Sequence, residues 1–252
     1  WKPVGEPGAA RELPFYERIS LGNFPLLTDS DPPLLPRFYG TQTVQDPEFG
    51  EIKYMIMEDM AAGFRKPSIL DLKMGVQTWD SDCSEDKRAG HIERDLETTT
   101  SEMGFRFCGM KRFSKKTQAY LKYPKHFGWD AKKRDDMEQH LMTFVHDGEN
   151  VRSDVIAVFM DRLGKIKKFM QAGQWRFYAA SILFIYDEAD SNSASCKADC
   201  RLIDFAHSWE LDPNEHMRDE GFIFGINMIE YFLQRILNKA SGRSIADVTV
   251  RL

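Results

Sequence analysis

Long apolar runs are missing from this sequence: no stretch approaches the roughly 20 residues that a membrane-spanning helix needs, and no signal-peptide pattern opens the chain. Cysteine is scarce, with four residues in 252. The nearest pair, Cys196 and Cys200, fits neither a zinc motif nor a C-x-x-C redox motif. We therefore expect no membrane insertion, no disulfide and no structural metal. We expect an intracellular protein of the nucleus, the cytoplasm or both.

The common phosphate-binding and kinase motifs are missing too. No G-x-x-x-x-G-K-[ST] motif occurs, which excludes a P-loop NTPase. Neither an H-R-D-x-x-x-x-N loop nor an A-P-E motif occurs, which argues against a protein kinase. Any nucleotide chemistry must therefore depend on other residues.

The composition is that of an ordinary globular protein, 42% hydrophobic and 29% charged, enough for one large domain or two small ones that share a cleft. The formal net charge of -5 argues against a nucleic-acid partner, but it is compatible with a local basic pocket for a small anion. We expect a monomer. Because the chain begins at Trp1 rather than Met, we also expect a piece of a longer protein.

Hydrophobic periodicity predicts strands and helices without strict alternation, which argues against a doubly wound sheet. Strands are expected at 34–44, 51–60, 67–75, 104–114, 176–188 (one long strand or a pair) and 200–208. Helices are expected at 10–20, 84–96, 134–148, 151–171 and 220–238. This order predicts an α+β fold with two lobes and a cleft between them. The N-terminal lobe would span 1–60, with a hinge at its end, and the C-terminal lobe 61–252.

The stretch PSILDLKMG places two charged residues, Asp71 and Lys73, in a segment that otherwise reads as buried strand. Residues two apart share a face of a strand, so the two side chains point the same way, about 6 to 7 Å apart at the backbone. Gly75 leaves room for a ligand to approach. An ordinary surface pair on a half-exposed strand explains the pattern equally well.

A second stretch, RLIDFAHS, ends an apolar run on Asp204. In protein kinases an aspartate followed by phenylalanine holds Mg²⁺ on the nucleotide phosphates, and a strand lysine paired with a helix glutamate contacts the same phosphates. Lys2 and Glu12 could form such a pair. The alternatives are an aspartate that caps a turn and a lysine without a role at the start of the chain.

With PSILDLKMG, ETTTSEMGFRFCGMK, RFYAASILFIYD and LIDFAHS in order, the chain resembles the inositol polyphosphate kinases, whose signature P-x-x-x-D-x-K-x-G is matched by Pro67, Asp71, Lys73 and Gly75. The resemblance implies a two-lobe fold related to protein kinases and ATP-grasp enzymes, with antiparallel sheets. It also implies Mg²⁺-dependent transfer of the ATP γ-phosphate to an inositol phosphate. Asp71 would accept the hydroxyl proton or fix the nucleotide, and Lys73 would contact the transferred group or the attacking hydroxyl.

The resemblance also assigns the nucleotide site. It implies that Lys2 is the phosphate-binding lysine and Glu12 its helix partner, and that Glu58 and Met60 form the hinge whose backbone meets adenine. Asp204 and Ser181 would hold the metal ion.

For the inositol phosphate, the resemblance points to His207 and to the helix after the signature, where Lys87, His91 and Arg94 are candidates. Their spacing of four and three residues places them on one helical face. Such a face is usually just solvated, but beside a cleft it could bind phosphate oxygens.

Two features depart from the family pattern. The usual pair of serines before the apolar residues is Ala180 and Ser181, and the loop from Asp190 to Lys197 is short. The resemblance favours a multikinase that acts on inositol tris- and tetrakisphosphates. A hexakisphosphate kinase is the first alternative, and a catalytically weak scaffold that binds inositol phosphates or protein partners is the second.

Overall fold

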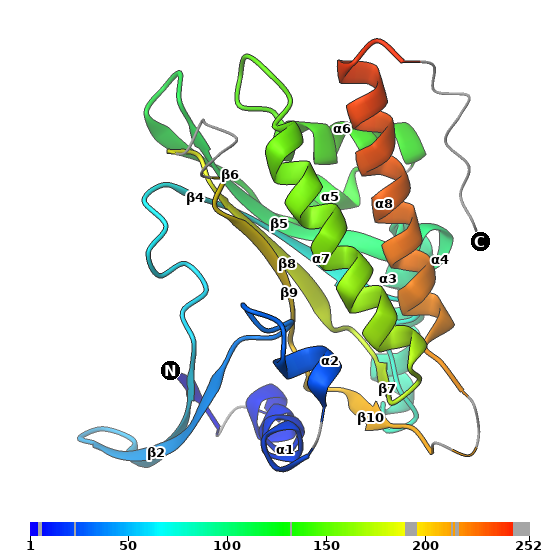
Figure 1. Cartoon of the computed structure of the whole chain (residues 1–252). Helices are drawn as coiled ribbons and strands as arrows, with labels where there is room; N and C mark the ends of the chain where they lie inside the picture. Colours follow the sequence, from blue (N-terminus) through cyan, green and yellow to red (C-terminus); the bar gives the residue numbers. More distant parts are fainter. Residues whose placement is uncertain are drawn as a thin grey trace.

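The computed structural model describes residues 1–4, 7–22, 24–131, 133–189, 196–212, 214 and 217–243 (Figure 1). Most of the loop at 190–197 therefore lies outside the described residues. All paired strands are antiparallel, and helices and sheets are mixed, so the α+β fold class is confirmed. The division into lobes near residue 60 stays a prediction.

The larger sheet has five strands in the order β6-β5-β4-β8-β9. Its strands are β4 (Pro67–Met74), β5 (Phe105–Ser114), β6 (Ala119–Tyr123), β8 (Ser181–Asp187) and β9 (Ala198–Ile203). The signature strand β4 lies at its centre, and its residues alternate strictly between half-buried and buried. This alternation is what the sequence predicted for a strand with one face on the core.

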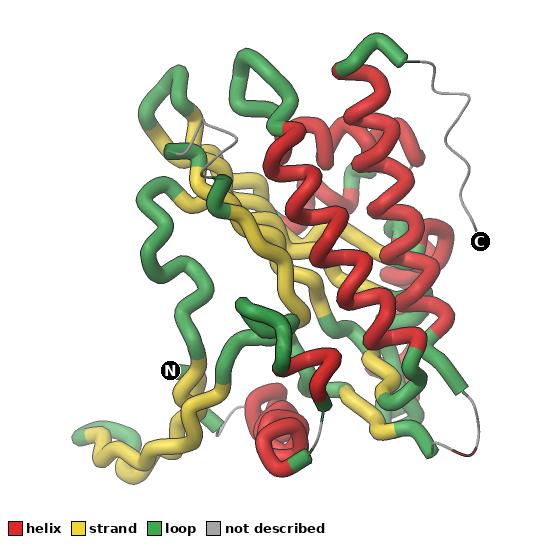
Figure 2. Tube along the Cα trace, viewed as in Figure 1, coloured by secondary structure: helices red, strands yellow, loops and turns green. Residues whose placement is uncertain are grey.

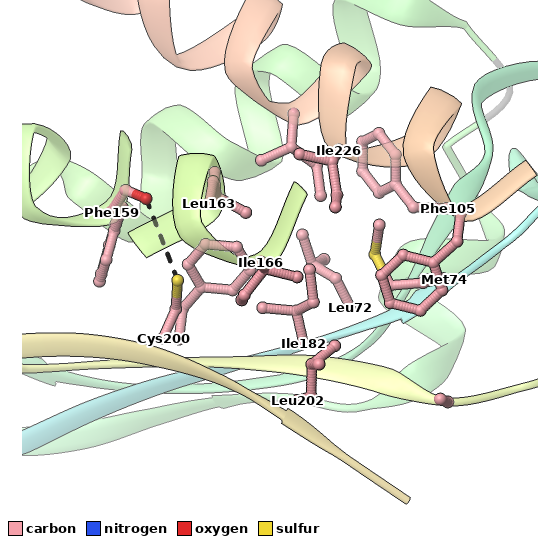
Figure 3. Close-up of a cluster of buried hydrophobic side chains, with 14 of the residues drawn as sticks. Leu72, Met74, Phe105, Phe159, Leu163, Ile166, Ile182, Cys200, Leu202 and Ile226 are labelled. Atoms are coloured by element: carbon pink, nitrogen blue, oxygen red, sulfur yellow. Dashed lines mark hydrogen bonds between the residues drawn. The ribbon is translucent and has the colours of Figure 1, made fainter. Parts of the chain in front are cut away.

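Two long helices, α7 (Ser153–Gln171) and α8 (Glu220–Ala240), cover one face of this sheet (Figures 1 and 2). Figure 3 shows how Leu72, Ile182 and Leu202 of three neighbouring strands lie against Leu163 and Ile226 of these helices, all fully or almost fully buried. The apolar residues that recur at helical spacing in the sequence therefore form the core-facing side of α7. The opposite face of the sheet is left for the site. The shorter helices of this part are α3 (Glu85–Glu97), α4 (Thr100–Met103), α5 (Lys125–Trp129) and α6 (Arg134–Val145).

A smaller sheet, in the order β1-β3-β2, lies with α1 (Pro7–Leu21) beside the larger one (Figure 1). Its strands are β1 (Lys2–Pro3), β2 (Phe38–Asp46) and β3 (Gly50–Met57). Met55 is the one residue of these strands that is buried, so this sheet depends on α1 for its core. Helix α1 in turn packs on the larger part of the protein: Phe15 stacks on Phe205 with ring centroids 4.1 Å apart.

Several segments differ from the sequence-based expectation, and at 176–188 the structure decides between the two alternatives left open. The strand expected at 34–44 begins only at Phe38, because Leu34 and Leu35 turn into the core before it. The segment 176–188 is a pair of separate strands: β7 (Trp175–Phe177) pairs with β10 (Ser208–Glu210), and β8 starts after a break at Ala179. The helix expected at 10–20 starts three residues earlier, at Pro7, and α2 (Pro25–Thr28) was not predicted.

Candidate active site

The open face of the larger sheet carries both charged residues of the signature. In the β4–β8 register Lys73 lies opposite Ser181, and in the β4–β5 register Lys73 lies opposite Arg106. Directly paired residues of antiparallel strands point to the same face. Asp71, Lys73, Ser181 and Arg106 therefore share one surface.

Asp71 is a carboxylate without its full set of partners. Its Oδ1 atom is buried and accepts no well-aligned hydrogen bond from the described residues, and the buried Ser181 hydroxyl, which lies within reach of this carboxylate, makes none either. Burial raises the pKa of the Asp71 carboxyl, although the neighbouring Ser181 and the charge of Lys73 act in the opposite direction. Buried oxygens that lack partners are costly, so their presence here indicates a place where a ligand completes the bonding.

Lys73 donates a hydrogen bond of 2.7 Å to the carbonyl oxygen of Ala179. Ala179 has a φ of 57°, and Asp204 has a φ of 64°, so two non-glycine residues near the site hold a left-handed backbone. Such conformations persist where the surrounding structure enforces them, often at functional sites. The ammonium group of Lys73 keeps two further N–H donors beyond this bond.

The predicted pair of Lys2 and Glu12 is present. The Lys2 ammonium is bonded to Glu12 Oε2 and lies 3.8 Å from Asp204 Oδ1, while Glu12 Oε1 accepts the backbone N–H of Phe205 at 3.2 Å. Glu12 thus joins the lysine of the small sheet to the Asp204–Phe205 turn. About half of the Asp204 side chain is exposed and faces the same space.

In the segment predicted to be the hinge, the Glu58 carboxylate is fully engaged. Its Oε2 accepts the Arg37 backbone N–H at 2.9 Å and an Arg201 N–H at 2.7 Å. Burial opposes the ionisation of Glu58, but these hydrogen bonds prevail and lower its pKa. Glu58 and Met60 also line a pocket of about 490 Å³. The Glu58 backbone N–H donates to the Arg37 carbonyl at 2.8 Å, so only the backbone carbonyl of this residue is left for an adenine.

Helix α3, predicted at 84–96, supplies three basic side chains with different settings. Lys87 is exposed, whereas His91 and Arg94 are half-buried. The His91 ring nitrogen Nδ1 lies 2.9 Å from Thr78 Oγ1. Burial, followed by the charge of Arg94, lowers the pKa of His91. Beneath them, Asp95 accepts hydrogen bonds from Thr78 and from Arg106 Nη1, the latter at 3.1 Å.

His207 also reaches this space, and it does so with a fixed ring. Its Nδ1 lies 2.6 Å from Oδ2 of the buried Asp80 and 3.4 Å from an Arg11 nitrogen. Of the predicted substrate-side residues, His91 and His207 therefore have defined side-chain partners, whereas Arg94 is half-buried and Lys87 is exposed.

Among the described residues no group of three or more His, Cys, Asp and Glu side chains is placed to hold a metal ion by itself. The Ser181 hydroxyl and the half-exposed Asp204 carboxylate nevertheless suit a hard divalent cation, which commonly completes its coordination with phosphate oxygens and water. The residues thus fit a metal ion that arrives with a nucleotide.

Residues 54–234 match the inositol polyphosphate kinase family. The chain belongs to this family. It is 30% identical over 210 residues to inositol hexakisphosphate kinase 3 of Mus musculus, and the aligned region covers 76% of this chain and 53% of that relative. It is 26% identical over 274 residues to inositol polyphosphate multikinase beta of Arabidopsis thaliana, and the aligned region covers 99% of this chain and 89% of that relative.

Solved structures of the same family share the fold. An inositol phosphate multikinase from S. cerevisiae, in complex with ADP and Mn²⁺, aligns with a TM-score of 0.75 at 23% identity over 94% of this chain and 98% of that one. A second inositol phosphate multikinase aligns with a TM-score of 0.72 at 24% identity over 89% and 99%. The chain spans about half the length of the mammalian hexakisphosphate kinases that it matches. No helix in the described part is long and apolar enough to cross a membrane.

Sequence reasoning missed three residues of this site: Thr78, Asp80 and Arg106. Arg106 could have been found, because it lies in the alternating strand pattern GFRF, but its partner strand could not. Asp80 lies 127 positions from His207 in the sequence, and no local sequence pattern predicts that the two side chains pair.

Proposed function

We propose that this inositol polyphosphate kinase family member transfers the γ-phosphate of ATP to a hydroxyl of an inositol polyphosphate. The observation that carries the proposal is that Asp71 and Lys73 share one face of β4, close enough to Asp204 for its charge to act on Asp71, while Lys2 of the Lys2–Glu12 pair lies 3.8 Å from Asp204. Phosphoryl transfer depends mainly on positioning and on neutralising charge, and these groups suit both tasks.

In this proposal the hydroxyl oxygen bonds to the γ-phosphorus, the bond from that phosphorus to the bridging oxygen breaks, and ADP leaves with the electron pair. Asp71 Oδ1, buried and without a well-aligned donor among the described residues, accepts the hydroxyl proton, which its raised pKa favours. Lys73 uses its remaining donors to neutralise the transferred group. Lys2 binds the ATP phosphates.

Asp204 and Ser181 would hold Mg²⁺ or a similar ion, which supplies charge neutralisation on the phosphates. The backbone of Glu58 and Met60 would bind adenine. The acceptor phosphates would lie between Lys73 and the residues Lys87, His91, Arg94, Arg106 and His207.

A multikinase that acts on inositol tris- and tetrakisphosphates is our first choice of substrate class. The Arabidopsis multikinase is similar along nearly its whole length, which supports this choice. The higher identity to mouse hexakisphosphate kinase 3 favours, as second candidate, an enzyme that makes pyrophosphates.

A product assay tests both. The protein is incubated with Mg-ATP and either inositol 1,4,5-trisphosphate or inositol hexakisphosphate, and products are resolved by charge. Addition to the trisphosphate at more than one position would support a multikinase, and a pyrophosphate would support the second candidate. Asp204→Ala should abolish turnover, while Asp135→Asn, an exposed change on α6, should not. Full activity of Asp204→Ala, or no product although ATP binds, would overturn the proposal and favour a scaffold.

A further inference from the structure

The short segment after the signature strand contacts two histidines that come from different elements. Thr78 and Asp80 are both buried, with 2% and 3% of their surface exposed. Thr78 Oγ1 lies 2.9 Å from His91 Nδ1, and Asp80 Oδ2 lies 2.6 Å from His207 Nδ1. Since Thr78 and Asp80 are two positions apart, one stretch of backbone sets both rings.

The hydrogen-bond inventory fixes which ring nitrogen carries the proton in His91. Thr78 Oγ1 donates its single proton to Asp95 Oδ1 at 2.7 Å, and the Asp95 carboxylate can only accept. The hydroxyl oxygen must therefore accept from His91, so Nδ1 of His91 is protonated. Its Nε2 is left for other partners.

The same logic applies to His207. A carboxylate at 2.6 Å accepts from Nδ1, so Nδ1 carries the proton. The Arg11 nitrogen, also a donor, lies farther away at 3.4 Å and contacts a nitrogen whose proton already points to Asp80. Again Nε2 is the free ring atom.

The segment is itself held in place. Gln77 donates to the Trp79 carbonyl at 2.7 Å, Arg88 of α3 lies 4.0 Å above the Trp79 ring, and the Thr78 backbone N–H donates to Asp95 Oδ2 at 2.8 Å. The first contact lies within the segment, and the contacts with Arg88 and Asp95 fix the segment on α3, the element that carries His91.

From this arrangement we propose that Thr78 and Asp80 are positioning residues that present the Nε2 atoms of His91 and His207 together to the phosphates of the acceptor. Neither residue needs to touch the substrate. The proposal rests on the function proposed above for its biological meaning, but the state of the two rings can be measured without turnover.

The first test is nitrogen-detected NMR of the histidine rings in the free protein at about pH 8, above the ordinary histidine pKa of about 6.5. We expect a proton on Nδ1 of both His91 and His207. Thr78→Val should release His91 alone, and Asp80→Ala should release His207 alone. A proton on Nε2 only, in either ring of the unmutated protein, would overturn the proposal, and this holds even if no inositol phosphate is a substrate or a variant fails to fold.

The second test is a double-mutant cycle on kcat/KM. Asp80→Ala should lower kcat/KM about tenfold when it is the only substitution. In the background of His207→Ala, it should lower kcat/KM less than about twofold. Asp82→Ala, an exposed change two positions on, is the matched control and should have no effect in either background. Equal losses in both backgrounds would show that Asp80 acts through general stability and not through His207.

Discussion

The two ends of the five-stranded sheet treat a buried carboxylate in opposite ways. At the Pro67 end of β4, Asp187 of the paired strand accepts three backbone N–H groups, from Arg65, Lys66 and Ala189, at 2.7, 3.0 and 2.9 Å. Farther along β4, toward its Met74 end, Asp71 keeps a buried oxygen with no well-aligned donor from the described residues. Both lie on paired strands of the same sheet, so the difference comes from what surrounds them.

The pKa values follow this difference. Burial alone would raise the pKa of Asp187, but the hydrogen bonds from Arg65, Ala189 and Lys66 outweigh it and lower the pKa. Burial prevails at Asp71 and raises its pKa. The comparison teaches that Asp187 holds the chain together through its backbone donors, whereas Asp71 keeps an oxygen unsatisfied for a ligand. Such sites trade stability for function.

The largest effect should come from Asp71→Asn. We expect kcat to fall at least about 100-fold, because the amide cannot accept the hydroxyl proton. The free energy of unfolding should stay the same or rise, since an unpaired buried charge is removed. Steady-state kinetics and urea unfolding of the same samples measure both. A loss of stability as large as the loss of activity would contradict the assignment of Asp71 to the reaction.

Asp187→Ala should give the reverse result. Three backbone donors lose their acceptor, so we expect about 2–3 kcal/mol of lost stability, with kcat per folded molecule unchanged. Asp135→Asn is again a suitable exposed control. If Asp187→Ala inactivated the protein without destabilising it, the two ends of the sheet would not differ in the way described.

The Pro67 end of the sheet also contains a buried hydroxyl. Tyr186 Oη lies 2.7 Å from both the Phe144 carbonyl and Glu188 Oε1, and the side chain of Glu188 is completely buried. Tyr186→Phe should cost about 1 kcal/mol of stability and leave activity intact. Tyr120→Phe, on the exposed strand β6, should change the melting temperature by less. Equal shifts for the two variants would remove Tyr186 from the stabilising network.

Much of this difference could be read from the sequence, but not all of it. The alternation in PSILDLKM predicted the strand and the shared face of Asp71 and Lys73, and the structure has both. The family resemblance predicted the pairing of Lys2 with Glu12. Two of the donors to Asp187, the N–H groups of Arg65 and Lys66, lie more than 100 positions away in the sequence. The same holds for the contact between Asp80 and His207, and only the folded chain brings these groups together. Hydrophobic periodicity reports local burial and does not report which polar groups meet.

The smallest effect, and the most specific, is on the pH dependence of stability. The folded-state pKa of Asp187 is lowered from 3.8, so its contribution is present above that value and is lost as the pH falls through the folded pKa. The folded-state pKa of Asp71 is raised from 3.8, so the protonated carboxyl contributes to the stability of the folded protein below pH 3.8. That contribution is lost as the pH rises through the folded pKa. Urea unfolding at a series of pH values should therefore show Asp71→Asn gaining on the unmutated protein as the pH rises. Asp187→Ala should lose its deficit only in acid. Parallel curves for the two variants would mean that both carboxylates sit in equivalent surroundings, and the distinction between the two ends would fail.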